Sequence, residues 1–77
     1  MSKHSKTLQA MRDHALDWRI EDLELVAKHH GITVRKPAGS HVVFMKERCP
    51  LVVTVPAKRP IKPVYVRQFV ELIDWSE

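Results

Sequence analysis

The hydrophobic positions of the chain change their spacing along the sequence, and this change predicts helices at both ends with strands between them. A first short stripe at helical spacing follows Ser5, a residue type that caps helices, and consists of Leu8, Met11 and Ala15. A second stripe follows Asp17, the predicted cap of the next helix, and consists of Ile20, Leu23, Val26, Ala27 and His30. Gly31 then stands where a left-handed glycine commonly ends a helix. The N-terminal part therefore predicts two helices, the first of them short.

From Ile32 onward, β-branched residues and alternation replace the helical spacing. The segments expected to form strands are 32–35, 41–46 and 51–55, with a turn at 37–40 and a loop at 46–50. Pro63 is placed to be the first residue of a last helix, with an apolar stripe made of Val66, Phe69, Val70 and Ile73. Short connections make the strands an antiparallel meander, with the helices on one face. The sequence thus predicts an α+β sandwich.

Length and composition narrow the class of protein. Seventy-seven residues provide one small core, and a hydrophobic share of 44% is normal for a globular chain. Cys49 is the one cysteine, which excludes an intrachain disulfide and fits a reducing compartment. No apolar run approaches the roughly 18 residues needed to cross a membrane. We therefore expect a single soluble, cytoplasmic domain with no membrane partner.

Charge is unevenly distributed along the chain. Between positions 13 and 24 five acids stand against one base, whereas between positions 28 and 67 nine bases stand against one acid. A basic stretch of this density is typical of a phosphate-binding surface, although short basic runs can equally be solvated surface. The acidic segment fits the start of a helix, where carboxylates favour the dipole. An aromatic share of 6% argues against a broad base-stacking platform.

His41 differs from the other histidines because it follows Gly39 and Ser40 at the mouth of a predicted strand, where a glycine lets a ligand approach the backbone. The cations expected to bind phosphate around it are Arg35, Lys36, Lys58, Arg59 and Lys62. A histidine in this setting can act as a general base near neutral pH. Ribonucleolytic cleavage needs such a base to take the 2′-hydroxyl proton, and cations to stabilise the anionic transition state. The alternative is a structural histidine at a strand end.

The other reactive side chains form no second catalytic pattern. Cys49 lies between Arg48 and Pro50 and is expected to be a small loop residue rather than a nucleophile. His29 and His30 are adjacent, and adjacent helical residues point about 100° apart, so they do not share a metal ion. Neither a cofactor nor a metal is expected.

Four short motifs carry a family resemblance: Gly-Ser-His-Val-Val-Phe at 39–44, Val-Thr-Val-Pro at 53–56, Ile-Lys-Pro at 61–63 and Val-Arg-Gln-Phe at 66–69. In this order and spacing they resemble the HicA family of toxin–antitoxin systems. Further segments, Ser-Lys-His at 2–4, Lys-Thr-Leu at 6–8 and Trp-Arg-Ile-Glu-Asp-Leu at 18–23, resemble its longer-headed members. The resemblance covers nearly the whole chain. It implies a double-stranded-RNA-binding-like α-β-β-β-α fold in one domain, 1–77, with an N-terminal extension at 1–16 and a core at 17–77.

The resemblance also implies a function. Members of the HicA family are mRNA interferases, so the chain is expected to be a metal-independent endoribonuclease toxin, neutralised by a HicB-like antitoxin that covers its active face. The histidine of the Gly-Ser-His element is catalytic in the family, which maps onto His41, and Gly39 and Ser40 are expected to contact RNA beside it. Val42 stands where many members have a second histidine, and residues 57–60 contain none where many members have one. Lys58 or Arg59 can replace that loop histidine as a charge, but not as an acid at neutral pH.

Two alternatives stay open from the sequence. The first is a non-catalytic RNA-binding module of the same fold, which is consistent with the missing histidines and with duplex recognition by shape. The second is a protein-interaction subunit with Trp18 and Trp75 as contact residues, although both can equally be partly buried anchors at helix ends.

Overall fold

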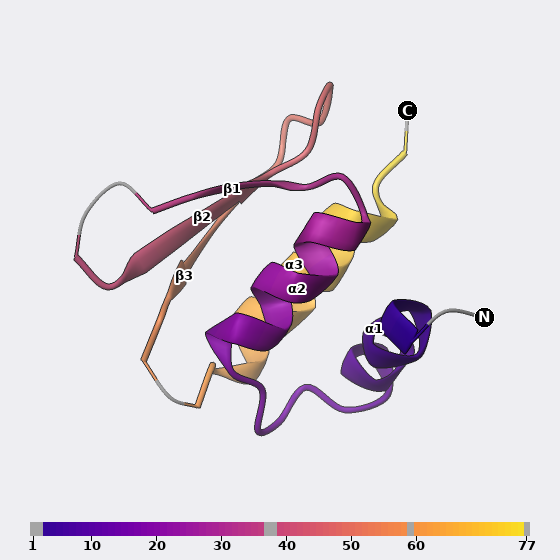
Figure 1. The fold of residues 1–77 in the computed structure, drawn as a ribbon, viewed down its shortest axis with the longest axis vertical. Coiled ribbons are helices and arrows are strands. Elements are labelled where there is room, and N and C mark those ends of the chain that lie inside the picture. The colour runs from indigo at the N-terminus through magenta and orange to yellow at the C-terminus, as the bar shows by residue number, and fades with distance from the viewer. Residues whose placement is uncertain (1–2, 37–38, 59, 77) are drawn as a thin grey trace.

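Three helices and one three-stranded sheet make up the structure, a computed structural model that describes residues 3–36, 39–58 and 60–76. The elements in chain order are α1 (Lys3–Asp13), α2 (Ile20–His29), β1 (Thr33–Arg35), β2 (His41–Met45), β3 (Val52–Pro56) and α3 (Pro63–Asp74). The strands are antiparallel in the order β1-β2-β3, and α2 and α3 cover one face of the sheet (Figure 1). The α1 helix packs against α2 and α3 (Figure 1). The predicted α+β class and antiparallel meander are confirmed.

The start of α2 differs from the prediction. The helix begins at Ile20 with Arg19 as the N-cap, and Asp17 instead occupies the preceding turn with a φ of 64°. The Asp22 carboxylate accepts a hydrogen bond from the backbone N–H of Arg19 at 3.0 Å, which satisfies a donor at the helix start. The end of α2 is as predicted, because Gly31 follows it with a φ of 69°.

The starts of α3, α1 and β1 agree with the prediction to different degrees. The α3 helix begins at Pro63, as predicted, where the missing N–H of proline leaves no bond unmade. The α1 helix begins at Lys3, so Ser5 lies within it, and the predicted cap at Ser5 is wrong. Ile32 lies outside β1 because its N–H donates to the carbonyl of Ala27 at 2.9 Å and belongs to the end of α2.

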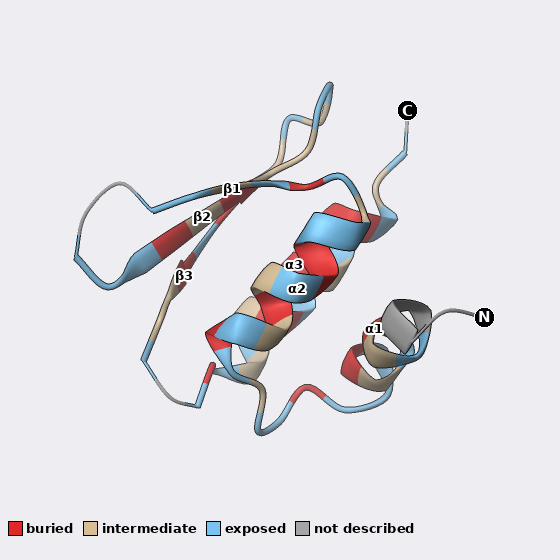
Figure 2. Ribbon diagram, in the orientation of Figure 1, coloured by how far each residue is buried: buried red, intermediate tan, exposed pale blue. Residues whose placement is uncertain are grey.

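One apolar core joins the sheet to all three helices. The register places Val42 opposite Val55 and Phe44 opposite Val53, and all four side chains are buried (Figure 2). The rings of Phe44 and Phe69 meet edge to face with centroids 4.9 Å apart, an arrangement that aromatic pairs favour. Within the described part of the chain every buried side chain is hydrophobic. The core therefore sits between the sheet and the helix layer.

The N-terminal segment is part of this same core. Leu8 and Met11 of α1 are 4% and 1% exposed, and they belong to the cluster that contains the buried residues of the sheet. Arg12 forms an ion pair with Asp74 near the end of α3, which joins the first and last helices at the surface. Residues 3–13 thus form a packed helix on the domain.

Candidate nucleic-acid interface

His41 is the first residue of β2 and is exposed at one end of the sheet. Its register partner on β3 is Pro56, and it belongs to the set of β2 residues that alternates with the buried Val42. Just before it, the carbonyl of Ser40 accepts a hydrogen bond from the N–H of Ala57, which ties the chain leaving β3 to the chain entering β2. Strand pairing therefore fixes the backbone of His41 while its side chain stays accessible.

The turn before His41 depends on a glycine conformation. Gly39 has a φ of 66°, in the left-handed region that side chains disfavour, and both Gly39 and Ser40 are exposed. A Cβ atom added at Gly39 would have no neighbouring atom within 4 Å. The requirement for glycine within the protein is thus conformational. The expected close approach of RNA at this position stays a prediction.

A depression of about 250 Å³ lies beside His41 and is bordered by residues from α2, from the end of β1 and from the end of β3. Its lining consists of Ile20, Glu21, Glu24, Lys36, Gly39, Ser40, His41, Val42 and Ala57. Four of the predicted site residues, Lys36, Gly39, Ser40 and His41, come together here. The sheet end therefore combines an accessible imidazole, a lysine and two carboxylates around one small hollow.

The charge of Lys36 is already matched by a carboxylate. Its Nζ lies 2.8 Å from Oε1 of Glu24, and the two side chains are 63% and 25% exposed. Glu21 lines the same depression. The sequence assigned these acids only to the start of the helix. Their spacing of three residues indicates that they share one face of α2, but the site that this face meets depends on how α2 packs.

The remaining predicted cations lie elsewhere. Arg35 pairs in register with Val43, on the opposite side of β1 from Val34, whose partner is the buried Phe44. Lys58 and Lys62 lie on a second hollow, and Arg59 lies outside the described residues. The single phosphate-binding cluster that the sequence predicts is therefore divided in the fold.

The second hollow is a groove of about 500 Å³ between the loop after β3, the start of α3 and the turn before α2. Its lining consists of Leu16, Asp17, Pro56, Lys58, Pro60, Ile61, Lys62, Pro63 and Tyr65. Pro56, the register partner of His41, lines the groove, while the next residue, Ala57, lines the depression. The two hollows are thus adjacent and share the chain at 56–57 as their common border. Sequence reasoning missed Leu16, Asp17 and Tyr65 as lining residues.

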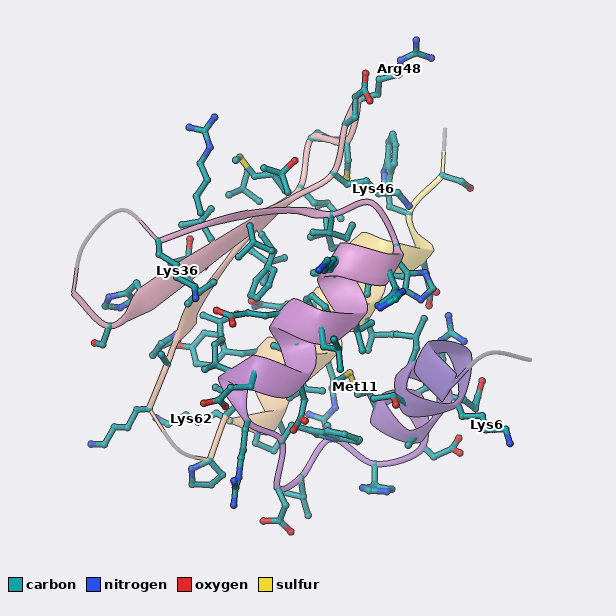
Figure 3. All side chains as sticks on the ribbon, in the orientation of Figure 1. Lys6, Met11, Lys36, Lys46, Arg48 and Lys62 are labelled. Carbon is teal, nitrogen blue, oxygen red and sulfur yellow. The ribbon has the colours of Figure 1, made fainter. Side chains whose placement is uncertain are left out.

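Two further bases of the stretch at 28–67 lie away from both hollows, and one of them, Lys46, donates hydrogen bonds within the protein. The Nζ of Lys46 donates to the backbone carbonyls of Ile73 at 2.8 Å and Trp75 at 2.6 Å, so this cation satisfies acceptors at the end of α3. Arg48 extends from the tip of the loop between β2 and β3, far along the molecule from Lys36 and Lys62 (Figure 3). Charge density along the sequence therefore overstates the charge of any one surface.

Trp18 and Cys49, two further residues considered from the sequence, have partners within the protein. The Nε1 of Trp18 donates to the carbonyl of His14 at 2.9 Å, and the two rings stack with centroids 5.9 Å apart. The Sγ of Cys49 accepts a hydrogen bond from the N–H of Leu51 at 3.4 Å. These contacts favour an anchoring role for Trp18 and a loop role for Cys49.

Metal sites and membrane spans are absent from the part of the chain that the structure describes, residues 3–36, 39–58 and 60–76. No three His, Cys, Asp or Glu side chains among them are grouped so as to hold a metal ion. No helix among them has the length and apolar character to span a bilayer. Comparison of the chain with protein-family models, curated proteins and solved structures finds no match.

Proposed function

We propose that the chain is a metal-independent endoribonuclease, the toxin of a type II toxin–antitoxin system, with His41 as the general base. The observation that carries the proposal is an accessible histidine held by strand pairing, next to the Gly39 turn and in one depression with Lys36. The order α2-β1-β2-β3-α3 is compatible with the double-stranded-RNA-binding-like arrangement that the HicA resemblance implies.

In the proposed reaction, an imidazole nitrogen of His41 takes the proton of a 2′-hydroxyl group. The 2′-oxygen attacks the adjacent phosphorus, the bond to the 5′-oxygen breaks, and the leaving oxygen takes its proton from water. The products are a 2′,3′-cyclic phosphate and a 5′-hydroxyl end. Nearby cations stabilise the added negative charge on the phosphoryl oxygens. The cleavage needs no metal ion at any step.

The phosphate competes with Glu24 for Lys36 in this proposal. An ion pair whose lysine is 63% exposed is screened by water, and such pairs contribute at most about 1 kcal/mol. Exchange of the Glu24 carboxylate for an RNA phosphate is therefore inexpensive. The nearby carboxylates still repel the substrate, so weak binding at the depression itself is expected, and the cations of the adjacent groove become important for affinity.

The proposed protein partner is a HicB-like antitoxin. The chain carries a net charge of +4, and its basic residues outnumber its acidic residues across positions 28–67. An acidic partner that binds Lys58 and Lys62 at the groove and extends over the end of the sheet would complement these lysines and exclude RNA from His41. Complex formation is then expected to weaken as the salt concentration rises.

The second candidate is a non-catalytic RNA-binding module of the same fold. It is favoured by the position of Lys58 and Lys62, which line a groove distinct from the depression at His41 and can hold phosphate without it. Phosphate contacts of this kind give affinity without sequence information and without chemistry.

Cleavage of end-labelled single-stranded RNA in EDTA separates the two candidates. The purified chain is compared with His41→Ala and with His29→Ala, a matched variant at an exposed histidine of α2. The endoribonuclease predicts cleavage by the wild type and by His29→Ala, with cyclic-phosphate ends, and a loss of at least about 100-fold in His41→Ala. Retained cleavage by His41→Ala would remove His41 from the mechanism. Binding by all three without cleavage would establish the RNA-binding module instead.

A further inference from the structure

The groove beside the His41 depression has the size and rigidity of a ligand site. Its volume of about 500 Å³ lies within the range of roughly 300–1,000 Å³ typical of small-molecule pockets. The N–H of Ile61 donates to the carbonyl of Trp18 at 2.9 Å, which joins the loop after β3 to the turn before α2. Ile61 itself is 2% exposed and gives the groove a fixed base. The groove is thus formed before any ligand arrives.

Its apolar walls suit a flat ligand. Tyr65 is half-buried and packs against the core, which holds the ring in place, and Pro56 and Pro63 add rigid rings to the lining. Leu16 is 61% exposed at the groove, a large apolar side chain that the fold leaves open to water. Rigid rings and an exposed leucine around one hollow favour an aromatic ring as the group that fills it.

Its charged groups suit a phosphate and a base edge. Lys58 and Lys62 are exposed, and neither forms an ion pair with a residue that the structure describes. Lys62 is the N-cap of α3, where the positive end of the helix dipole adds to its charge, and Lys58 lies in the loop before it. Asp17 provides a carboxylate that accepts hydrogen bonds from amino or imino groups. Flat apolar walls, two cations and one acceptor match the parts of a nucleotide.

We propose that this groove binds one nucleotide of single-stranded RNA, with the base against Tyr65 and the prolines and the flanking phosphates on Lys58 and Lys62. The groove and the His41 depression meet at residues 56–57, so the bound nucleotide lies next to the phosphate that His41 serves. The inference rests on the proposed function for this placement. It assigns the choice of base to the groove and the cleavage step to His41.

The proposal is tested with RNA that cannot be cleaved. A short oligonucleotide carrying 2′-O-methyl groups has no free 2′-hydroxyl nucleophile, so its affinity reports binding alone. Fluorescence anisotropy compares the wild type with Leu16→Ala in the groove and with the matched variant Leu25→Ala, at a leucine 48% exposed on α2. We expect Leu16→Ala to weaken binding several-fold and Leu25→Ala to bind as the wild type does. Since Leu16 is exposed, its replacement leaves the core intact.

A second variant tests stacking on the ring. Tyr65→Leu keeps an apolar side chain but removes the aromatic face, and base stacking is worth about 1–3 kcal/mol, which corresponds to a loss of at least about fivefold in affinity. Amide signals in nuclear magnetic resonance spectra then locate the bound RNA: Ile61 and Tyr65 are expected to shift in the wild type. A shift at Ile61 that survives in Tyr65→Leu, with weakened affinity, supports the proposal even if the variant is less stable.

The outcomes separate this inference from the proposed function. If the wild type binds RNA in the groove but does not cleave it, the proposed nucleotide site is supported and the proposed endoribonuclease function is wrong. Cleavage that depends on His41, with both groove variants binding as the wild type does, would overturn the groove and leave the endoribonuclease standing. If a synthetic peptide rich in Glu and Leu shifts Ile61 and Tyr65 while the RNA does not, the groove is a protein site and the inference is wrong.

Discussion

At the residue scale, Gly39 determines how the chain enters the strand that begins with His41. Its φ of 66° costs about 1–2 kcal/mol for a residue with a Cβ, and no atom within 4 Å adds a clash. We expect Gly39→Ala to lower the free energy of unfolding by about that amount and to reduce RNA cleavage further, because relief of the strain moves the backbone at His41. Urea unfolding and the cleavage assay measure the two effects.

Gly31 provides the matched control for that prediction. Its φ of 69° is nearly the same, its added Cβ would also meet open space, and it lies at the end of α2, away from the depression. Gly31→Ala is expected to lose similar stability and to keep its cleavage rate. Equal losses of cleavage in the two glycine variants would show that the effect comes from stability and not from the placement of His41.

The sequence predicts the conformation of a single residue well where that conformation depends on the local backbone alone. The left-handed conformation at Gly31 and the helix start at Pro63 are local properties, and both are confirmed. The partner of Lys36 was not predictable in the same way, since Glu24 reaches it only after α2 has packed beside the end of β1. Long-range pairing of side chains depends on the tertiary arrangement, which a pattern of residue types does not contain.

At the element scale, α1 is expected to be held by its buried face and not by its surface ion pair. Met11 is 1% exposed, so Met11→Ala leaves a cavity in the core and lowers the free energy of unfolding by about 2–5 kcal/mol. The neighbouring Arg12 pairs with Asp74, and these side chains are 37% and 46% exposed, so Arg12→Ala lowers the free energy by at most about 1 kcal/mol. Urea denaturation followed by circular dichroism compares the two variants.

Equal destabilisation by Met11→Ala and Arg12→Ala would contradict this account of α1. The comparison also bears on the expected division of the chain into an extension and a core. Leu8 and Met11 share one cluster with the residues of the sheet, so loss of the α1 contacts is expected to weaken the whole domain in a single cooperative transition. A separate early transition for residues 3–13 would indicate an independent segment.

The strands were easier to predict than the helix starts for a physical reason. A run of β-branched residues favours a strand wherever it lies in the chain, and the run at 51–55 does form β3 (Val52–Pro56), although Val52 is exposed. A helix start depends on which nearby side chain reaches a free backbone N–H. The sequence predicts Asp17 as the cap of α2 from its residue type, whereas Arg19 is the N-cap and Asp22 accepts the hydrogen bond from its backbone N–H.

At the scale of the whole molecule, the basic charge is distributed over several surfaces. Lys46 donates a hydrogen bond to a carbonyl near the end of α3, and Lys36 forms an ion pair with Glu24. Arg48 lies at the tip of the loop between β2 and β3 (Figure 3). The sequence predicts that Lys36, Lys58 and Lys62 belong to one phosphate-binding group, but Lys36 lines the depression at His41 whereas Lys58 and Lys62 line the groove. Among the described residues, the lysines that line the groove are Lys58 and Lys62.

This distribution predicts which lysines control the salt dependence of RNA binding. Each phosphate contact with single-stranded nucleic acid contributes roughly 0.7 to the slope of the logarithm of affinity against the logarithm of salt concentration. Lys58→Ala with Lys62→Ala is therefore expected to reduce the slope by roughly 1.4 and to weaken binding at low salt. The matched control, Lys6→Ala with Lys28→Ala, removes the same charge from exposed positions on α1 and α2. If both double variants change the slope equally, RNA binding follows the net charge of the molecule and not the groove.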